Sequence, residues 1–242
     1  MDSAVLRRRL VELARRMVER ELISSLAGNL SARMPDGNLL VTPSGVNKAE
    51  MPPDSLLVID TDGNCLGGDQ SCTPTSELPM HLEVYRRRPE AGAVIHAHPI
   101  SCVALSLAGI SLLPPYIPEA LVILGPVPTT PYATPASTEN RDAIAELIET
   151  HDAIILAHHG SLTVGRDIDE AYYRLEILEH TARTVALAHQ LGGPRELTPA
   201  EVAKLLAVRE RLGYARPGED LLRERIAAEV KRVLLDLGPA GW

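Results

Sequence analysis

Large apolar residues in the first part of the chain follow a helical period and then a strand-like one. From Leu6 to Met17 they recur at spacings of four, three and four, which predicts an amphipathic helix that ends near Glu21. Apolar runs at 39–42 and 56–60 then predict two short strands. Because these strands are too close together for a helical crossover, we expect that part of the sheet to be antiparallel.

The rest of the chain alternates between helical patterns and short apolar runs. We expect, in order, a helix from Thr75 or Ser76 to about Arg88, a strand at 93–98, a short helix through Leu107, a strand at 121–124, a helix at about 139–150, a buried strand at 153–157, a long helix behind Asp167, and two final helices of which the first opens at Thr198 and Pro199. Asp167 and Glu170, three residues apart, resemble a capping box. Strands interleaved with helices in this way indicate an α/β protein.

Length and composition fit a single domain. The chain has 242 residues, of which 45% are hydrophobic and 23% charged, and no internal repeat or linker divides it. We therefore expect one domain over residues 1–242, with the C-terminal helices at about 198–236 as part of it. The sequence has no Phe and one Trp, so its core must be filled mainly by aliphatic side chains.

Charge and cysteine content argue against several classes of protein. The net charge is −8, and the cluster Arg7–Arg9 falls on the solvated face of the first helix, so we expect no nucleic-acid partner. No apolar stretch is long enough to cross a bilayer, so we expect no membrane partner. Three cysteines at irregular spacings suit a reducing compartment better than a disulfide framework. We expect a cytoplasmic protein.

Three histidines form a candidate metal site. His96 and His98 are two positions apart in a predicted strand, so both side chains face the same side of the sheet. His159 ends another buried strand, directly before a glycine. Three neutral imidazoles with one open position are a common catalytic zinc arrangement. The alternative is that the His-x-His pair is only a polar strand end.

A carboxylate and three polar turns could complete a site. Glu77 falls in the first turn of a predicted helix, where it could act as an acid or base beside a metal, or could only complement the helix dipole. The segments Gly28-Asn29, Ser44-Gly45 and Thr75-Ser76 offer small polar groups and accessible backbone to an anion. Each segment is also an ordinary turn, so they indicate an anion site only if the fold brings them together.

These motifs, in order, resemble the class II aldolase/adducin family. The resemblance covers about residues 5–215 and rests on five segments: Gly28–Ser31, Thr42–Gly45, Pro74–Glu77, His96–His98 and His159-Gly160. It implies a single-domain, three-layer α/β/α fold around a mostly antiparallel sheet. It also implies a homotetramer whose active sites lie between subunits.

The resemblance gives the candidate residues roles. His96, His98 and His159 would hold zinc, although manganese or cobalt would also suit imidazole and carboxylate ligands. Glu77 would be the catalytic acid/base and would coordinate the metal when substrate is absent. The substrate phosphate would bind to Gly28, Asn29, Ser44, Gly45, Thr75 and Ser76. His158 precedes His159, and we choose His159 as the ligand because the family pattern places the ligand directly before the glycine.

Two tyrosines and one lysine complete the expectations. Tyr116 lies where the resemblance places a tyrosine that enters the neighbouring subunit's site and protonates the aldehyde oxygen. Tyr214 is a second candidate, with helix packing as the equal alternative. The segment 114–119 is more proline-rich and more acidic than in the fuculose-phosphate branch of the family, so the sequence does not define the aldehyde. Lys48 is expected at an exposed loop position.

The function that the resemblance implies is that of a metal-dependent aldolase. It would cleave a ketose 1-phosphate, such as L-fuculose 1-phosphate or a 5-deoxy-pentulose 1-phosphate, into dihydroxyacetone phosphate and a short aldehyde through a metal-stabilised enediolate. The same scaffold also serves sugar-phosphate 4-epimerases and decarboxylases of 3-oxo sugar-acid phosphates. A non-catalytic, adducin-like binding module is the alternative from a different class, and the retained histidines argue against it.

Overall fold

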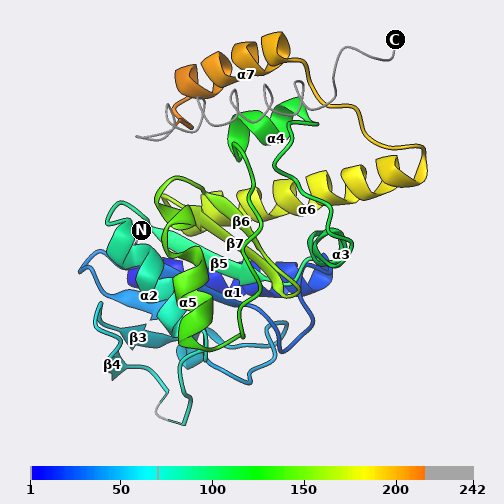
Figure 1. Cartoon of the computed structure of the whole chain (residues 1–242). Coiled ribbons are helices and arrows are strands. Elements are labelled where there is room, and N and C mark those ends of the chain that lie inside the picture. The colour runs from blue at the N-terminus through cyan, green and yellow to red at the C-terminus, as the bar shows by residue number, and fades with distance from the viewer. Residues whose placement is uncertain (1, 70, 216–242) are drawn as a thin grey trace, which may run out of the picture.

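The computed structural model describes residues 2–69 and 71–215, which form one central sheet covered by helices on both faces (Figure 1). The helices and strands are α1 (Ser3–Glu19), β1 (Asn29–Arg33), β2 (Leu39–Val41), β3 (Leu57–Ile59), β4 (Cys65–Gly67), α2 (Leu78–Arg87), β5 (Ala93–Ala97), α3 (Ile100–Leu107), α4 (Pro118–Ile123), α5 (Thr138–Ala145), β6 (Ala153–Leu156), β7 (Gly160–Gly165), α6 (Ile168–Gln190) and α7 (Pro199–Arg211), with single 3-10 turns at Pro53–Ser55 and Leu147–Glu149.

The sheet has seven strands in the order β4-β3-β2-β1-β5-β7-β6, and all neighbours are antiparallel. The α/β class and the antiparallel arrangement of the strands within 39–66 are thereby confirmed. Strand β5 lies near the middle of the sheet, where its register pairs Asn29 of β1 with His96 and His96 with Leu162 of β7. Residues from distant parts of the sequence therefore meet along β5.

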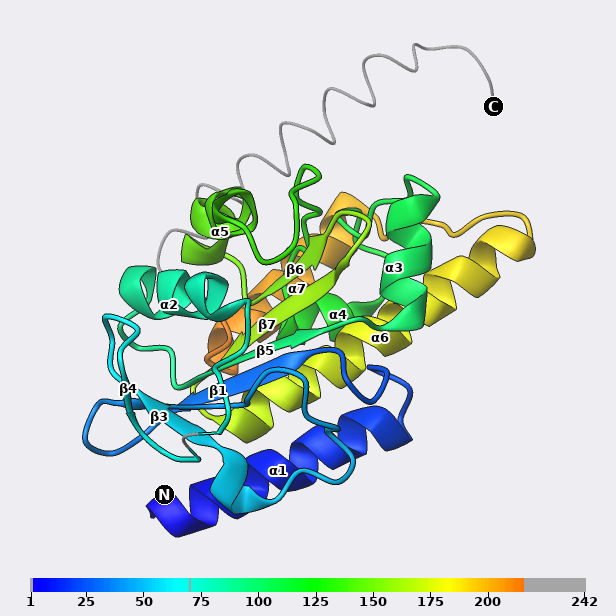
Figure 2. The same cartoon turned by 90° about the horizontal axis from the view of Figure 1, so that it is seen from below.

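Two helical layers enclose the sheet, as the view in Figure 2 shows. Helices α1 and α6 pack on one face, and α2 and α5 on the other. Alternation along β5 divides its side chains between these layers: Ala93, Ile95 and Ala97 join the core with α1 and α6, whereas Val94 joins the core with α2. His96 thus belongs to the face that α2 covers.

Several element boundaries differ from the sequence-based predictions. The strand predicted at 121–124 is wrong, because these residues continue helix α4, which Ile117 caps and Pro118 opens. A four-residue apolar run cannot by itself distinguish a buried strand from a buried helical turn, and here Pro118 at the first helical position favours the helix. Helix α2 begins at Leu78, after a turn in which the Glu77 amide donates to Thr75 Oγ1.

Helix caps follow the sequence closely in the second half of the chain. The Asp167 side chain accepts from the Glu170 amide as predicted, but the Glu170 carboxylate turns to Arg166, so only half of a capping box forms. Thr198 caps α7 with a complete capping box. The predicted final helix, to about residue 236, lies outside the described residues. No helix within the described part is long and apolar enough to cross a membrane.

Candidate metal centre

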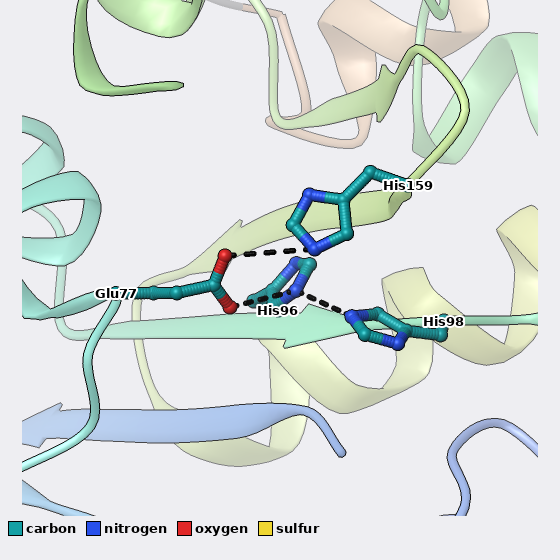
Figure 3. A group of neighbouring side chains, drawn as sticks. All are labelled: Glu77, His96, His98 and His159. Atoms are coloured by element: carbon teal, nitrogen blue, oxygen red, sulfur yellow. Dashed lines mark hydrogen bonds and ion pairs between the residues drawn. The ribbon is translucent and has the colours of Figure 1, made fainter. Parts of the chain in front are cut away.

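His96 lies in β5 and His98 directly follows this strand, and both side chains point toward Glu77 at the start of α2, as the strand alternation predicts (Figure 3). The His96 side chain is fully buried, and its Nε2 atom lies 2.8 Å from His98 Nε2. Its other nitrogen, Nδ1, lies 2.9 Å from the carbonyl oxygen of Ser161 on β7. Because a carbonyl oxygen only accepts, Nδ1 carries the proton, and this hydrogen bond aims Nε2 at the other donor atoms.

His159 enters the same site from the turn between β6 and β7. Its ring centroid lies 4.6 Å from that of His96 and 4.9 Å from that of His98. His158 has a positive φ of 59°, a conformation that separates its side chain from that of its neighbour. The exposed His158 ring packs edge-on against Tyr132 instead. His159 is therefore the member of the pair that joins the cluster.

Gly160 permits this approach of β7 to β5. A Cβ atom at this position would lie 2.2 Å from the carbonyl oxygen of Ala97 and 2.9 Å from the His98 ring. Both contacts are far below van der Waals separation, so any larger residue would push the two strands apart. The glycine that follows His159 therefore leaves the space in which β7 can lie close to β5 beside the metal cluster.

Glu77 completes the cluster from the N-terminus of α2. Its carboxylate makes no hydrogen bond to the helix backbone, which speaks against simple capping as its role. Instead, Oε2 lies 2.9 Å from His96 Nε2 and Oε1 lies 3.5 Å from His159 Nε2. One donor atom each from Glu77, His96, His98 and His159 lie within 4.8 Å of one another. Three imidazoles and a carboxylate at this spacing form a binding cluster for a divalent metal.

The protonation states suit metal binding. Burial lowers the pKa of His98 and of His159 to about 4, so both imidazoles are neutral at neutral pH. Burial alone would raise the pKa of Glu77, but the neighbouring His96 and the hydrogen bond from Asn29 outweigh it and hold that pKa well below the ordinary value. Neutral nitrogens and an ionised carboxylate are the forms that coordinate a metal.

A chain of buried hydrogen bonds lies behind Glu77. Asn29 Nδ2 donates to Glu77 Oε2 over 2.9 Å, and Asn29 Oδ1 faces His81 Nε2 at 2.6 Å. His81 Nδ1 lies 2.6 Å from Ser31 Oγ, which lies 2.9 Å from the hydroxyl of Tyr85. Since Asn29 Oδ1 can only accept, His81 carries its proton on Nε2 and each donor in the chain points toward Glu77. Burial lowers the pKa of His81 to about 3, which keeps this ring neutral.

A second amide contacts the same carboxylate. Asn140 of α5 is buried, and its Nδ2 atom lies 3.4 Å from Glu77 Oε1. Asn140, His81, Ser31 and Tyr85 were not among the site residues predicted from the sequence. For His81 a signal existed, because it follows Glu77 by four residues and therefore shares a helix face with it. For Asn140 no such signal existed, since only the tertiary fold brings α5 to α2.

The three polar turns meet beside the metal cluster. A cavity of about 240 Å³ is lined by residues from all of them and from the cluster: Gly28, Asn29, Ser44, Gly45, Thr75, Ser76, Glu77, His98 and His159 are among its walls. This is the convergence that the sequence alone could not establish. A larger depression of about 700 Å³ lies elsewhere, but arginines there pair with surface carboxylates, such as Arg87 with Glu149.

Gly28 has a structural reason for its place in this wall. Its φ is +69°, and a Cβ atom there would lie 2.6 Å from Ile23 and 3.0 Å from the carbonyl oxygen of His96. Glycine is therefore required both by the backbone conformation and by the close approach to the metal-site strand. Gly45 has the same φ of +69° but nothing within 4 Å of such an atom, so only the conformation constrains it.

Three further candidates lie away from the metal cluster or in unexpected surroundings. Tyr116 packs beside α4 in an apolar pocket with Leu112 and Leu121, and burial, followed by the charge of Glu196, raises its pKa. Its proposed place in a neighbouring subunit's site stays a prediction. Tyr214 follows α7, where its amide donates to the carbonyl of Arg209. The expectation of an exposed Lys48 is wrong: this side chain is buried and lines the cavity.

Comparisons with known proteins agree with this fold and this cluster. The family described as Class II Aldolase and Adducin N-terminal domain matches residues 8–186. The 3-oxo-tetronate 4-phosphate decarboxylase of Escherichia coli strain K12 is 35% identical over 206 residues, which cover 83% of this chain and 94% of that protein. An L-fuculose phosphate aldolase of Methanococcus maripaludis strain C7 is 36% identical over 126 residues, or 52% of this chain and 66% of that protein.

A solved structure has the same backbone fold. The crystal structure of YgbL from Escherichia coli superposes with a TM-score of 0.78 at 34% identity, and the match covers 84% of this chain and 98% of that one. The antiparallel sheet between helical layers, with three histidines and a glutamate at its centre, defines an α/β protein with a divalent-metal site. The chain belongs to the class II aldolase/adducin family.

Proposed function

We propose that this protein is a metal-dependent decarboxylase of a 3-oxo sugar-acid phosphate, with 3-oxo-tetronate 4-phosphate as the first candidate substrate. The observation that carries the proposal is the cavity in which the metal cluster and the three polar turns share one wall. The decarboxylase relatives are similar over nearly their whole length, whereas the aldolase of Methanococcus is similar over 66% of its length. That difference favours decarboxylation over the aldol cleavage predicted from the sequence.

The chemistry needs one electron sink and one proton. Loss of the carboxylate as carbon dioxide breaks the bond to the neighbouring carbon and leaves the electron pair there, next to the ketone. Protonation of that carbon then gives dihydroxyacetone phosphate. A divalent metal held by His96, His98 and His159 would supply the Lewis acidity that stabilises negative charge on the ketone oxygen.

The residues of the chain would divide the remaining tasks. We assign Glu77 the relay of a proton from solvent water to the reacting carbon, because its carboxylate lies among the imidazoles and in the cavity wall. Gly28, Asn29, Ser44, Gly45, Thr75 and Ser76 would hold the phosphate and so orient the reacting carbon. The asparagine contacts to Glu77 would fix the carboxylate in place.

Product analysis tests this proposal. Purified protein loaded with zinc, manganese or cobalt would be offered 3-oxo-tetronate 4-phosphate, and released carbon dioxide and dihydroxyacetone phosphate would be measured with and without a chelator. We expect equal amounts of both products and their loss with chelator. Absence of carbon dioxide from protein that contains stoichiometric metal would refute decarboxylation.

The aldolase function is the second candidate, and the 36% identity to the Methanococcus protein favours it. It would form the same three-carbon product from a ketose 1-phosphate, with an aldehyde as the other fragment in place of carbon dioxide. A parallel panel of ketose 1-phosphates, including L-fuculose 1-phosphate, distinguishes the two activities. A 4-epimerase would return one inverted sugar and no fragments, and an adducin-like binding module would turn over none of these substrates.

Substitution of Glu77 tests its role in either reaction. We expect Glu77→Gln to lower turnover by about 10²- to 10⁴-fold, because an amide cannot exchange the proton. The variant should also stop the exchange of solvent deuterium into dihydroxyacetone phosphate, followed by NMR. Phosphate binding should be retained, which serves as the control for folding. Normal deuterium exchange would exclude Glu77 as the proton-transferring group.

A further inference from the structure

The cavity beside the metal cluster has a single cationic side chain in its described lining. Lys48 contributes it, and the lysine is only 1% exposed. The neighbouring Ser44, Gly45, Thr75 and Ser76 carry no charge, and Glu77 is ionised in the same wall. Neutral donors and a nearby carboxylate would leave a phosphate group bound to these turns without a positively charged side chain in direct contact.

The hydrogen bonds of Lys48 do not account for a positive charge at a buried position. Its Nζ atom donates to the carbonyl oxygens of Val46 at 3.0 Å and Pro43 at 3.4 Å, both in its own loop. Among the described residues no carboxylate contacts it. An ammonium group has three N–H donors, so these two bonds leave one donor for another partner.

Burial of such a group is costly unless an anion accompanies it. Moving an ammonium out of water carries a penalty that carbonyl dipoles offset only in part. Burial accordingly lowers the pKa of Lys48, and no opposing charge raises it again. A structural lysine in this position would be expected to have a carboxylate partner, as the buried Arg88 has in Asp152.

The loop that carries Lys48 also carries Ser44 and Gly45, two of the residues proposed to hold the phosphate. Two carbonyls of residues 43–46 are fixed by the ammonium group, and Ser44 and Gly45 lie between them. The amide of Ser44 is already used by Thr73, so this loop can offer its hydroxyl and its lysine to a ligand. The lysine and the small polar residues thus face the same volume.

We propose that Lys48 is the counter-charge for the phosphate group of the substrate, held by its own loop so that one N–H donor points into the cavity. The proposal rests on the proposed phosphorylated substrate, but it does not depend on which carbon–carbon bond the enzyme breaks. It makes Lys48 a specificity-determining residue that favours phosphorylated over unphosphorylated sugars.

The experiment compares phosphate binding by four metal-loaded proteins. They are the wild type, Lys48→Gln, Lys48→Met and Lys204→Met, the last of which removes an exposed lysine on α7 as the matched control. Inorganic phosphate, dihydroxyacetone phosphate and glycolate are the probes, and isothermal titration calorimetry and thermal unfolding are the readouts. Glutamine retains donors for the two loop carbonyls but has no charge, so it separates a loop-capping role from a charge role.

We expect both Lys48 variants to bind phosphate about 10- to 100-fold more weakly than wild type, because a charge-assisted hydrogen bond is lost. Without phosphate, Lys48→Gln should unfold at the same temperature as wild type or higher, since a buried uncompensated charge is removed. Added phosphate should raise the unfolding temperature of wild type and of Lys204→Met more than that of either Lys48 variant.

Three outcomes would overturn the proposal. Wild-type phosphate affinity in Lys48→Gln would show that the lysine only caps its loop. Destabilisation of Lys48→Gln without phosphate, with unchanged affinity, would show the same. A loss of affinity for glycolate, a carboxylate probe, with phosphate affinity retained would assign Lys48 to a substrate carboxylate. If wild type itself does not bind phosphate, the proposed substrate class fails, whatever the Lys48 variants do.

Discussion

At the scale of single residues, backbone torsion decides which of two adjacent histidines can bind a metal. The positive φ of His158 turns this residue toward Tyr132 and the next one toward His96 and His98. The sequence could place a histidine before Gly160, but it could not derive from the residues alone which of the pair faces the strand. The choice of His159 depended on the family resemblance, and the geometry supports it.

The histidine pair gives the first prediction. His159→Ala should weaken metal binding by more than about 100-fold, since loss of a direct ligand should exceed the 10- to 100-fold effect of outer contacts. His158→Ala, its matched control, should retain the metal. Metal content after dialysis, measured by atomic spectroscopy, checks both variants. Equal retention of metal by the two variants would contradict the assignment.

The hydrogen-bond chain behind Glu77 gives a second prediction. His81→Leu should lower kcat by about 10-fold or more with little change in KM, because Asn29 loses the partner that orients its amide. His81→Gln, which can still donate to Asn29, should restore part of this loss. Tyr85→Phe, at the far end of the chain, should have the smallest effect. Steady-state kinetics at constant metal content would detect this order, and an equal loss in all three variants would contradict it.

At the scale of elements, the sequence predicted strands and helix caps better than it predicted short apolar runs. The strand β5 was predictable because apolar residues fill it, although the predicted strand included His98, which lies directly after β5. Helix α4 was not, because four apolar residues fit either structure and only tertiary contacts with α6 and α7 make the helical form bury them. The position of Lys48 was not predictable either, since a lysine in a turn is ordinarily exposed and the cavity that buries it is a tertiary feature.

The C-terminal end of α2 carries a prediction about pH. A hydrogen bond from Arg86 is the main cause that lowers the pKa of Glu83. Burial opposes this shift and a hydrogen bond from Arg87 adds to it, so that the pKa falls from 4.5 to about 2. A carboxyl group with a lowered folded-state pKa contributes stability above pH 4.5, and this stability is lost as the pH falls toward 2. The full shift would be worth about 3 kcal/mol, but solvent screens the exposed arginine, so we expect about 1 kcal/mol.

Denaturant unfolding at several pH values tests this contribution. Glu83→Gln should lower the free energy of unfolding at pH 7, and the difference from wild type should shrink between pH 4.5 and 3. Glu19→Gln removes an exposed ion pair with Arg15 and should change the free energy of unfolding by only about 0.3 kcal/mol. A difference between Glu83→Gln and wild type that is independent of pH would mean that packing, rather than charge, stabilises this end of α2.

At the scale of the whole molecule, the single chain holds all four candidate metal ligands but leaves Tyr116 in a separate pocket. The expected homotetramer with shared sites would account for both facts, because the tyrosine would serve a neighbouring subunit. The sequence could suggest this only through the family resemblance, since no pattern within one chain reports on contacts between chains.

Mixed oligomers test this arrangement. In the aldol cleavage that is the second candidate reaction, Glu77→Gln and Tyr116→Phe should each be nearly inactive, but mixtures of the two should regain activity after subunits exchange. In such a mixed oligomer, some sites would contain an intact Glu77 from one chain and an intact Tyr116 from the other. Size-exclusion chromatography with light scattering would report the subunit number. Mixtures no more active than their components would contradict a shared site.

The metal cluster joins parts of the chain that are far apart in sequence, and this has a consequence for the order of assembly. Of the four candidate ligands, an unfolded chain holds only His96 and His98 close together, because Glu77 and His159 join them when α2 and β7 pack against the centre of the sheet. Full affinity therefore exists only after the centre of the sheet has closed. A bound ion should in turn slow the opening of that centre, so the amide protons of β5 should exchange with solvent more slowly in the loaded protein, and the rate of metal release should follow the rate at which these strands separate.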